Sequence, residues 1–217
     1  MSMNTKTRRL TLMAMLAAMA YLIMVIGRIP IVMFLKYDPK DVVIAISGFL
    51  LGPVQALLIT VVVALIEMLT VSDTGFIGFF MNALSTAAFV CPAAWLYRRK
   101  HTLRGAVVGL TVGVLAMVAA MIAWNYLVTP YYMGYPRQAV VELLLPMFLP
   151  FNLGKGALNA AFTMLLYKPV VGGLKKAKLL PPDNAQHPAR RRNIYVTLLC
   201  VFVALTAILC FYVLGHS

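Results

Sequence analysis

Four polar side chains interrupt an otherwise apolar stretch that is long enough to cross a membrane. The stretch runs from Leu145 to Lys168 and contains Asn152, Lys155, Asn159 and Thr163. At about 100° per residue, these four side chains fall within one narrow sector of a helix. A lysine inside a membrane is costly unless it faces protein or a water-filled cavity, so it marks a candidate functional site. The alternative is that the stripe only ties this helix to its neighbours.

The composition is typical of a multi-pass helical membrane protein. The 217 residues are 62% hydrophobic and only 12% charged, which is unlike a soluble domain. The net charge of +13 could suggest a nucleic-acid partner, but in a membrane protein it more simply reports basic residues on the cytoplasmic side. We therefore expect contact with lipid and not with nucleic acid. The three cysteines lie far apart in apolar runs, so neither a metal site nor a disulfide framework is expected.

Apolar runs separated by turn residues predict seven membrane helices. The run from Asp41 to Thr70 would extend about 45 Å as one helix, whereas a hydrocarbon core is about 30 Å thick. Gly52-Pro53 divides it into a short helix and a longer one. Residues 28–41 are expected to be a loop or re-entrant segment, residues 71–78 a turn, and residues 129–142 a polar, aromatic loop. The spans are Leu10–Gly27, the two parts of Asp41–Thr70, Phe76–Tyr97, Gly105–Val128, Leu145–Lys168 and Ile194–Leu214.

Basic residues are distributed unevenly between the two ends of these spans. With the N-terminus in the cytoplasm, 14 of the 19 lysines and arginines lie inside, within residues 6–9, 98–104 and 168–192. This positive-inside bias favours a cytoplasmic N-terminus. The polar segments 28–41, 71–78 and 129–142 then meet Asn152 and Lys155 in the outer half of the bundle. We expect a binding pocket there that opens to the outside.

The predicted organisation has three parts. Residues 1–180 form a six-helix membrane domain that carries the pocket. Residues 181–193 form a cytoplasmic linker rich in proline and arginine. Residues 194–214 form an additional transmembrane helix that would carry the C-terminus outside. Because that helix has no polar stripe, we expect a peripheral anchor facing lipid, and we expect truncation after Leu180 to leave ligand binding intact.

Signatures of enzymes and ATPases are missing from the sequence. Gly154-Lys155-Gly156 imitates the tail of a phosphate-binding P-loop, but the upstream glycine and the following serine or threonine are absent. The chain is therefore not expected to hydrolyse ATP itself. Neither paired carboxylates nor a histidine cluster suggests catalysis, so no catalytic residues are assigned.

Five motifs along the chain occur together in one known family. They are an alanine-rich first helix with Ala14 and Ala18, FLKYDPKDV (34–42) leading into GFLLGP (48–53), PAAWLYRRK (92–100), Asn125-Tyr126, and LPFNLGKG (149–156) running to LLYK (165–168). With these motifs, residues 8–178 resemble the substrate-binding S components of energy-coupling factor (ECF) transporters, in particular the riboflavin-specific type. The helix at 194–214 lies outside the family's six-helix pattern.

The resemblance implies a fold, a location and partners. The fold would be an all-α multi-pass bundle of six S-component helices with an additional C-terminal transmembrane helix, in a bacterial cell membrane. The chain would capture riboflavin from outside and deliver it inward with a transmembrane coupling protein and two cytoplasmic ATPases. Ala14 and Ala18 would dock on the coupling protein, and the loaded component would topple to release the vitamin. Riboflavin would be the transported ligand, and no cofactor is expected.

Physical chemistry and the resemblance indicate the same pocket. The isoalloxazine ring of riboflavin is a flat aromatic plane with a polar edge, which requires apolar walls and a few amide or cationic donors. Asn152, Lys155 and Asn125 could supply these donors, and Leu35, Lys36 and Tyr37 could form a lid. The candidate ligand-binding residues are Asn152, Lys155, Asn125, Leu35, Lys36, Tyr37, Asp38 and Asn82.

Other functions stay open at this point. The chain could be an S component for another vitamin or for another flavin such as FMN. It could instead be a small integral-membrane enzyme, which the lack of a catalytic cluster disfavours. A structural membrane protein without a transport role would not need polar residues at pocket depth.

Overall fold

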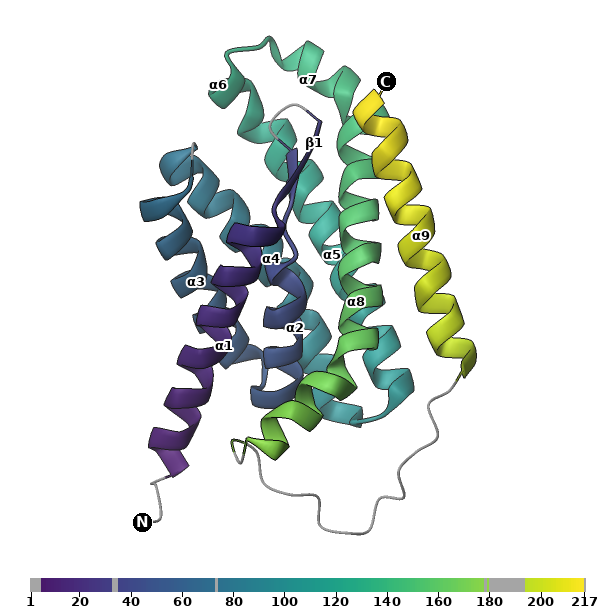
Figure 1. Ribbon diagram of the computed structural model, residues 1–217. Helices are drawn as coiled ribbons and strands as arrows, with labels where there is room; N and C mark the ends of the chain where they lie inside the picture. The colour runs from purple at the N-terminus through teal and green to yellow at the C-terminus, as the bar shows by residue number, and fades with distance from the viewer. Residues whose placement is uncertain (1–4, 33–34, 73, 178, 180–193, 217) are drawn as a thin grey trace.

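The protein is a bundle of long helices with a small β-hairpin near one end (Figure 1). The computed structural model describes residues 5–32, 35–72, 74–177, 179 and 194–216. The linker predicted for residues 181–193 lies outside the described residues. The long helices are α1 (Thr5–Gly27), α2 (Lys40–Leu51), α3 (Pro53–Thr70), α4 (Gly75–Lys100), α5 (Leu103–Leu127), α8 (Leu149–Lys176) and α9 (Ile194–His216).

All seven predicted helices are present, and Gly52-Pro53 separates α2 from α3 as predicted, but α2 is too short to be one of the predicted membrane spans. Gly52 has φ +104°, a backbone conformation that favours glycine, and Pro53 occupies the first turn of α3. Within the described residues, six helices are long and apolar enough to cross a membrane: α1, α3, α4, α5, α9 and the continuous helical segment Arg137–Leu174. With 12 residues, α2 extends only about 18 Å. It is buried from Lys40 to Phe49, so protein surrounds it instead of lipid.

The prediction of a loop or re-entrant segment at residues 28–41 is wrong. Most of this segment folds into an antiparallel hairpin of β1 (Ile29–Val32) and β2 (Leu35–Tyr37). Ile29 pairs with Tyr37, and Pro30 with Lys36. Proline is tolerated in β1 because a two-stranded sheet consists of edge strands, where one amide hydrogen is not needed for pairing. The hairpin then leads into α2 at Lys40.

The polar loop expected at residues 129–142 is also helical in large part. It contains the short helices α6 (Thr129–Met133) and α7 (Arg137–Leu143), and a π-helical turn, η1 (Leu144–Phe148), joins α7 to α8. Gly134, with φ +66°, separates α6 from α7. The sixth span is therefore longer than the predicted segment 145–168, because Pro146 and Pro169 are accommodated within helical structure.

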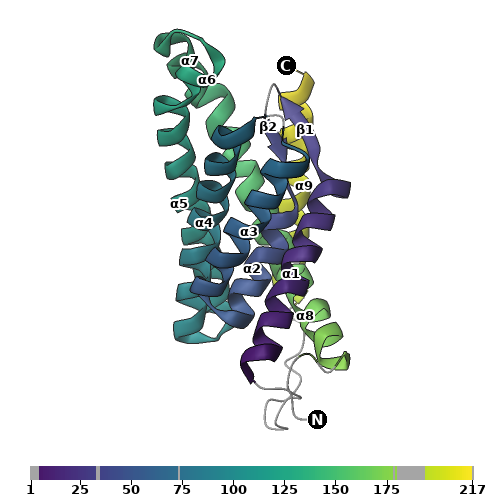
Figure 2. The ribbon, with the colours of Figure 1, turned by 90° about the vertical axis from the view of Figure 1, so that its left-hand side faces the viewer.

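Hydrogen bonds show which helix ends lie together. Near the start of α1, Arg9 donates to the carbonyl of Leu51 at the end of α2, over 3.3 Å. Its neighbour Arg8 donates to the carbonyl of Leu179, just beyond α8. The start of α1 and the C-terminal end of α9 lie at opposite ends of the bundle (Figures 1 and 2). The hairpin lies at the same end of the bundle as the C-terminal end of α9. This arrangement agrees with the predicted alternation of the spans.

The additional helix α9 packs along α8 (Figure 1). Its buried side chains are Cys200, Ala204, Ala207 and Phe211, at intervals of four, three and four residues. The other faces are exposed, as a lipid-facing helix requires. The peripheral position is therefore as predicted, but one side of α9 belongs to a buried apolar cluster that also includes Leu35 and Tyr37 of the hairpin.

Candidate binding cavity

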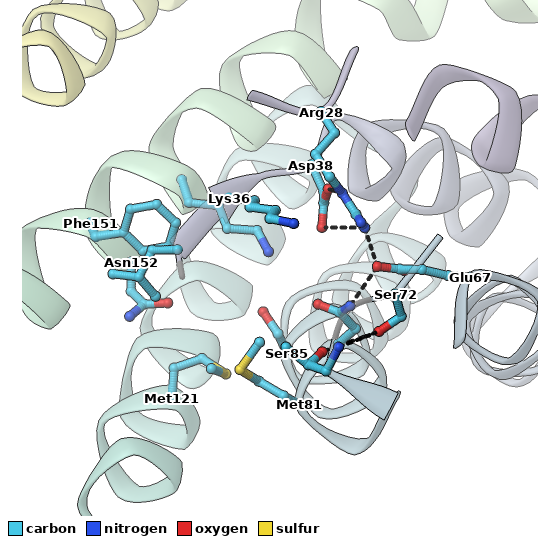
Figure 3. Close-up of a pocket in the computed structure, with 14 residues that line it drawn as sticks. Arg28, Lys36, Asp38, Glu67, Ser72, Met81, Ser85, Met121, Phe151 and Asn152 are labelled. Atoms are coloured by element: carbon cyan, nitrogen blue, oxygen red, sulfur yellow. Dashed lines mark hydrogen bonds and ion pairs between the residues drawn. The ribbon is translucent and has the colours of Figure 1, made fainter. Parts of the chain in front are cut away.

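A cavity of about 60 Å³ lies beneath the hairpin, between α3, α4, α5 and α8. In Figure 3, Arg28, Asp38 and Glu67 lie on one side of it, Phe151 and Asn152 on the other. Six of the eight predicted ligand-binding residues line this cavity: Leu35, Lys36, Asp38, Asn82, Asn152 and Lys155. The structure therefore brings together residues that are more than a hundred positions apart in the sequence.

The polar stripe of α8 is buried along its whole length and has two parts. Asn152 and Lys155 line the cavity, and the side-chain amide of Asn152 donates to the carbonyl of Phe148. Asn159 and Thr163 lie one and two turns farther along and are fully buried. Their hydrogen bonds go to protein groups. The first part of the stripe therefore faces the cavity, and its second part ties α8 to the hairpin and α2.

Asp41 is the centre of a buried polar cluster below the cavity. Its carboxylate lies 3.4 Å from the Lys155 ammonium. It accepts hydrogen bonds from the Thr86 hydroxyl at 2.7 Å and the Asn159 amide at 3.2 Å. The Tyr37 hydroxyl donates to the other side of the Asn159 amide at 3.0 Å. This cluster links the hairpin, α2, α4 and α8, and it supplies the counter-charge that a buried lysine needs.

A second cluster of charges joins the hairpin to α3 and α4. Arg28 donates to Asp38 at 2.7 Å and also to Glu67. The Lys40 ammonium lies 2.9 Å from each of the same two carboxylates. Asn82 donates to Glu67 at 2.7 Å. We call these five residues the Glu67 network; it fixes the base of the hairpin against the bundle.

Burial and charge act in opposite directions on Asp38. Burial alone would raise the pKa of its carboxyl group, but the positive charges of Lys40, Lys155 and Arg28 hold that pKa well below its ordinary value. The carboxylate therefore stays charged at neutral pH. Asp38, Asp41 and Glu67 together balance Arg28, Lys40 and Lys155, so the buried ion pairs around the cavity carry no surplus charge among themselves.

Two predicted site residues do not line the cavity. Tyr37 is buried, bonds to Asn159 and packs against Phe211 of α9. Its side chain lies on the other face of β2 from Lys36, as strand alternation requires. Asn125 is fully buried in α5 and accepts a hydrogen bond from Thr129. Its amide nitrogen has no hydrogen-bond partner within the described part of the chain.

The structure adds lining residues that the sequence did not single out. Arg28 and Glu67 are charged, Ser85 contributes a hydroxyl, and Met121 and Phe151 form part of the apolar wall. Arg28 and Glu67 carried a usable signal, because charged residues next to apolar runs are uncommon and usually paired. Ser85, Met121 and Phe151 are ordinary residues of membrane helices, so only the three-dimensional arrangement identifies them.

The chemistry of the cavity is that of binding. Its carboxylates are paired with cations, so none is poised as a general acid or base. Within the described residues, no group of three His, Cys, Asp or Glu side chains could hold a metal ion. What the cavity offers is amide, ammonium and hydroxyl groups beside methionine and phenylalanine side chains, which suits an amphipathic small molecule.

A family comparison agrees with this geometry. The family model of the ECF transporter substrate-specific component matches residues 8–167. The chain belongs to this family. Its members are substrate-binding S components of transporters and not enzymes, so the molecule bound is a transported substrate and not a cofactor. The protein is a multi-pass membrane protein with the S-component bundle, to which α9 is added after the end of the match.

Individual relatives extend the comparison. This chain is 25% identical over 184 residues to the riboflavin transporter RibU of Streptococcus thermophilus. The match covers 79% of this chain and 87% of the relative. The chain is 27% identical over 181 residues to RibU of Staphylococcus aureus, covering 79% and 94%. A solved structure of the S component of a bacterial ECF transporter is 27% identical, with a TM-score of 0.67. The match covers 79% of this chain and 99% of that one.

Proposed function

We propose that this S component binds riboflavin at the cavity beneath the hairpin and serves its uptake into the cell. The observation that carries the proposal is that polar Asn152 and Lys155 line the same cavity as apolar Phe151 and Met121. A flavin needs this combination, because its ring system is apolar on both faces and polar along one edge. The names of the relatives support riboflavin as the substrate.

The dimensions of the cavity require it to open for a flavin. A volume of about 60 Å³ is far below the roughly 300–1,000 Å³ of typical small-molecule sites. The hairpin contributes Leu35 and Lys36 to the lining, and Asp38 follows directly after it. Displacement of the hairpin would therefore enlarge the cavity without separating the long helices.

Uptake requires partners, and the surface of α1 suits one. Ala14 and Ala18 are exposed on α1, whereas Ala17 between them is buried against the bundle. Two exposed small residues four positions apart allow another helix to approach closely. We propose that this face contacts a transmembrane coupling protein, which in turn works with two cytoplasmic ATPases. The S component has no P-loop of its own to drive transport.

The proposed orientation follows from charge. The end of the bundle with the starts of α1 and α5 and the end of α4 carries Arg8, Arg9 and residues 98–104. Basic residues gather on the cytoplasmic side of membrane proteins. We therefore propose that this end faces the cytoplasm, that the hairpin and cavity face outside, and that the C-terminal end of α9 is also outside.

Titration of riboflavin fluorescence tests the proposal. Replacing a partner in a buried polar contact costs about 1–3 kcal/mol, which corresponds to about 5–150-fold in affinity. Asn152→Ala and Lys155→Ala should each weaken riboflavin binding by that order in purified protein. Thr111→Ala is the matched control, since this polar side chain is exposed on α5 and donates to the carbonyl of Val107 in its own helix. FMN titrated in parallel separates riboflavin from its phosphorylated form.

Two results would contradict the proposal. One is the absence of riboflavin binding by the natural chain at micromolar concentrations. The other is unchanged affinity in both cavity variants, which would place the flavin elsewhere. Since Arg28, Lys40 and Lys155 already have carboxylate partners, we expect riboflavin to bind at least as tightly as FMN.

A further inference from the structure

The buried face of α9 ends in an aromatic contact with the binding site. Cys200, Ala204 and Ala207 are small residues that let α9 lie close to α8, and Phe211 follows them on the same face. Phe211 is 7% exposed, whereas Phe202 on the opposite face is 65% exposed. The two phenylalanines of this helix therefore have different surroundings, although the sequence around both is apolar.

The Phe211 ring packs against two aromatic rings, one in the cavity wall and one in the hairpin. Its ring stacks on Phe151 with a centroid distance of 5.6 Å and an interplanar angle of 28°. It also meets the ring of Tyr37 at 5.9 Å and 51°. Both arrangements are among the favourable geometries for aromatic pairs. Phe151 is part of the cavity wall on α8, and Tyr37 is the last residue of β2.

Gly154 makes room for the Phe211 ring on α8. A Cβ atom at this position would lie 2.8 Å from one ring carbon of Phe211 and 3.3 Å from another. The ring therefore rests almost directly on the backbone of α8, in the turn that holds Asn152 and Lys155. An alanine at position 154 would push the ring away from its present place.

The hairpin connects this contact to the cavity. Leu35 and Tyr37 belong to the apolar cluster that includes Phe211, while Leu35, Lys36 and Asp38 line the cavity. Figure 2 shows β1 beside the C-terminal half of α9. Movement of the hairpin away from the cavity would separate Tyr37 from Phe211. The energy of the aromatic contact therefore stabilises the closed position of the hairpin.

We propose that Phe211 of α9 is a positioning residue for the substrate site, which holds the hairpin closed over the cavity and fixes the Phe151 wall. Because the cavity must open for a flavin, this contact slows both the binding and the release of substrate. The effect on flavin kinetics rests on the proposed function, whereas the effect on the hairpin does not. The prediction from sequence that truncation after Leu180 leaves ligand binding intact stays a prediction, and the contact of Phe211 adds the expectation that α9 sets the rates of binding and release.

Hydrogen exchange of the unliganded protein tests the contact directly. The amide hydrogens of β1 and β2 should exchange about three- to tenfold faster in Phe211→Ala than in the natural chain, which is the range expected for loss of an aromatic pair. Phe202→Ala is the matched control on the lipid-facing side of α9 and should leave the hairpin unchanged. Equal exchange of the hairpin in Phe211→Ala and Phe202→Ala would overturn the proposal.

Stopped-flow fluorescence with riboflavin gives the second readout. In Phe211→Ala, both the association and dissociation rate constants should rise about three- to tenfold, while the equilibrium constant changes less than either. A variant that is merely less well folded would not bind faster, so a raised association rate separates positioning from general damage. Unaltered rate constants would contradict the proposal. If neither the natural chain nor the variant binds riboflavin, the proposed function fails. Hydrogen exchange of the hairpin amides then still decides the role of Phe211.

Gly154→Ala provides an independent variant. It should speed hairpin exchange in the natural background by displacing the Phe211 ring. In the Phe211→Ala background the same substitution should add little, because the ring it displaces is already gone. Additive effects of the two substitutions would show that Gly154 and Phe211 act separately, against the proposed contact.

Discussion

Glu67→Gln is the sharpest test of the charge balance beneath the hairpin. Glu67 is 2% exposed and accepts hydrogen bonds from Arg28, Lys40 and Asn82. Removing one partner of a buried ion pair costs about 3–5 kcal/mol. Because Arg28 and Lys40 both keep Asp38, and glutamine keeps one acceptor oxygen, we expect a smaller loss of about 2–3 kcal/mol.

Thermal unfolding of the purified protein measures this loss. At about 2–4 °C per kcal/mol for a chain of this size, Glu67→Gln should lower the midpoint by about 4–12 °C. Intrinsic tryptophan fluorescence can follow the transition, since the chain contains two tryptophans. Glu142→Gln is the control, as Glu142 is an exposed carboxylate at the same end of the bundle.

A double variant separates charge from shape. Adding Lys40→Met to Glu67→Gln removes one positive charge together with one negative charge and leaves the Arg28–Asp38 pair intact. The double variant should therefore lose at least about 1 kcal/mol less unfolding free energy than the two single variants lose in sum. The reasoning is refuted if Glu67→Gln melts within about 1 °C of Glu142→Gln, or if the two single losses simply add.

The remaining predictions concern partners and orientation. Ala14→Trp and Ala18→Trp should abolish uptake by cells while the purified chain still binds riboflavin, because both residues are exposed on α1; Ala17→Trp, at a buried position, should instead destabilise the chain. Loss of riboflavin binding in the exposed variants would identify the alanine face as internal packing. An epitope placed after Ser217 should be reached by antibody on intact cells, and detection only after lysis would reverse the proposed position of the C-terminal end of α9.

Sequence patterns predicted the helices because their signals are local. Apolar runs of membrane length and the Gly52-Pro53 break each report on a single segment. The polar stripe from Asn152 to Thr163 was readable for the same reason, since four residues of one helix define a face by themselves. The structure bears out these elements with small changes at their ends.

The hairpin and the binding-site contacts could not be derived in the same way. Residues 28–41 contain two prolines, which indicate a loop, and their strands are stabilised by partners from α3, α8 and α9. The pairing of Glu67 with Lys40 depends on how α3 packs, which no local pattern specifies. Phe211 was missed because an apolar side chain that contacts protein and one that contacts lipid look alike in sequence.

The position of α9 beside β1 has a consequence for biosynthesis. The hairpin is complete at Tyr37, whereas α9 begins only at Ile194. During translation the contact between β1 and α9 can therefore form only after every other helix of the bundle has been made. Chains released before α9 is made would have the complete hairpin but would lack the contact between Tyr37 and Phe211.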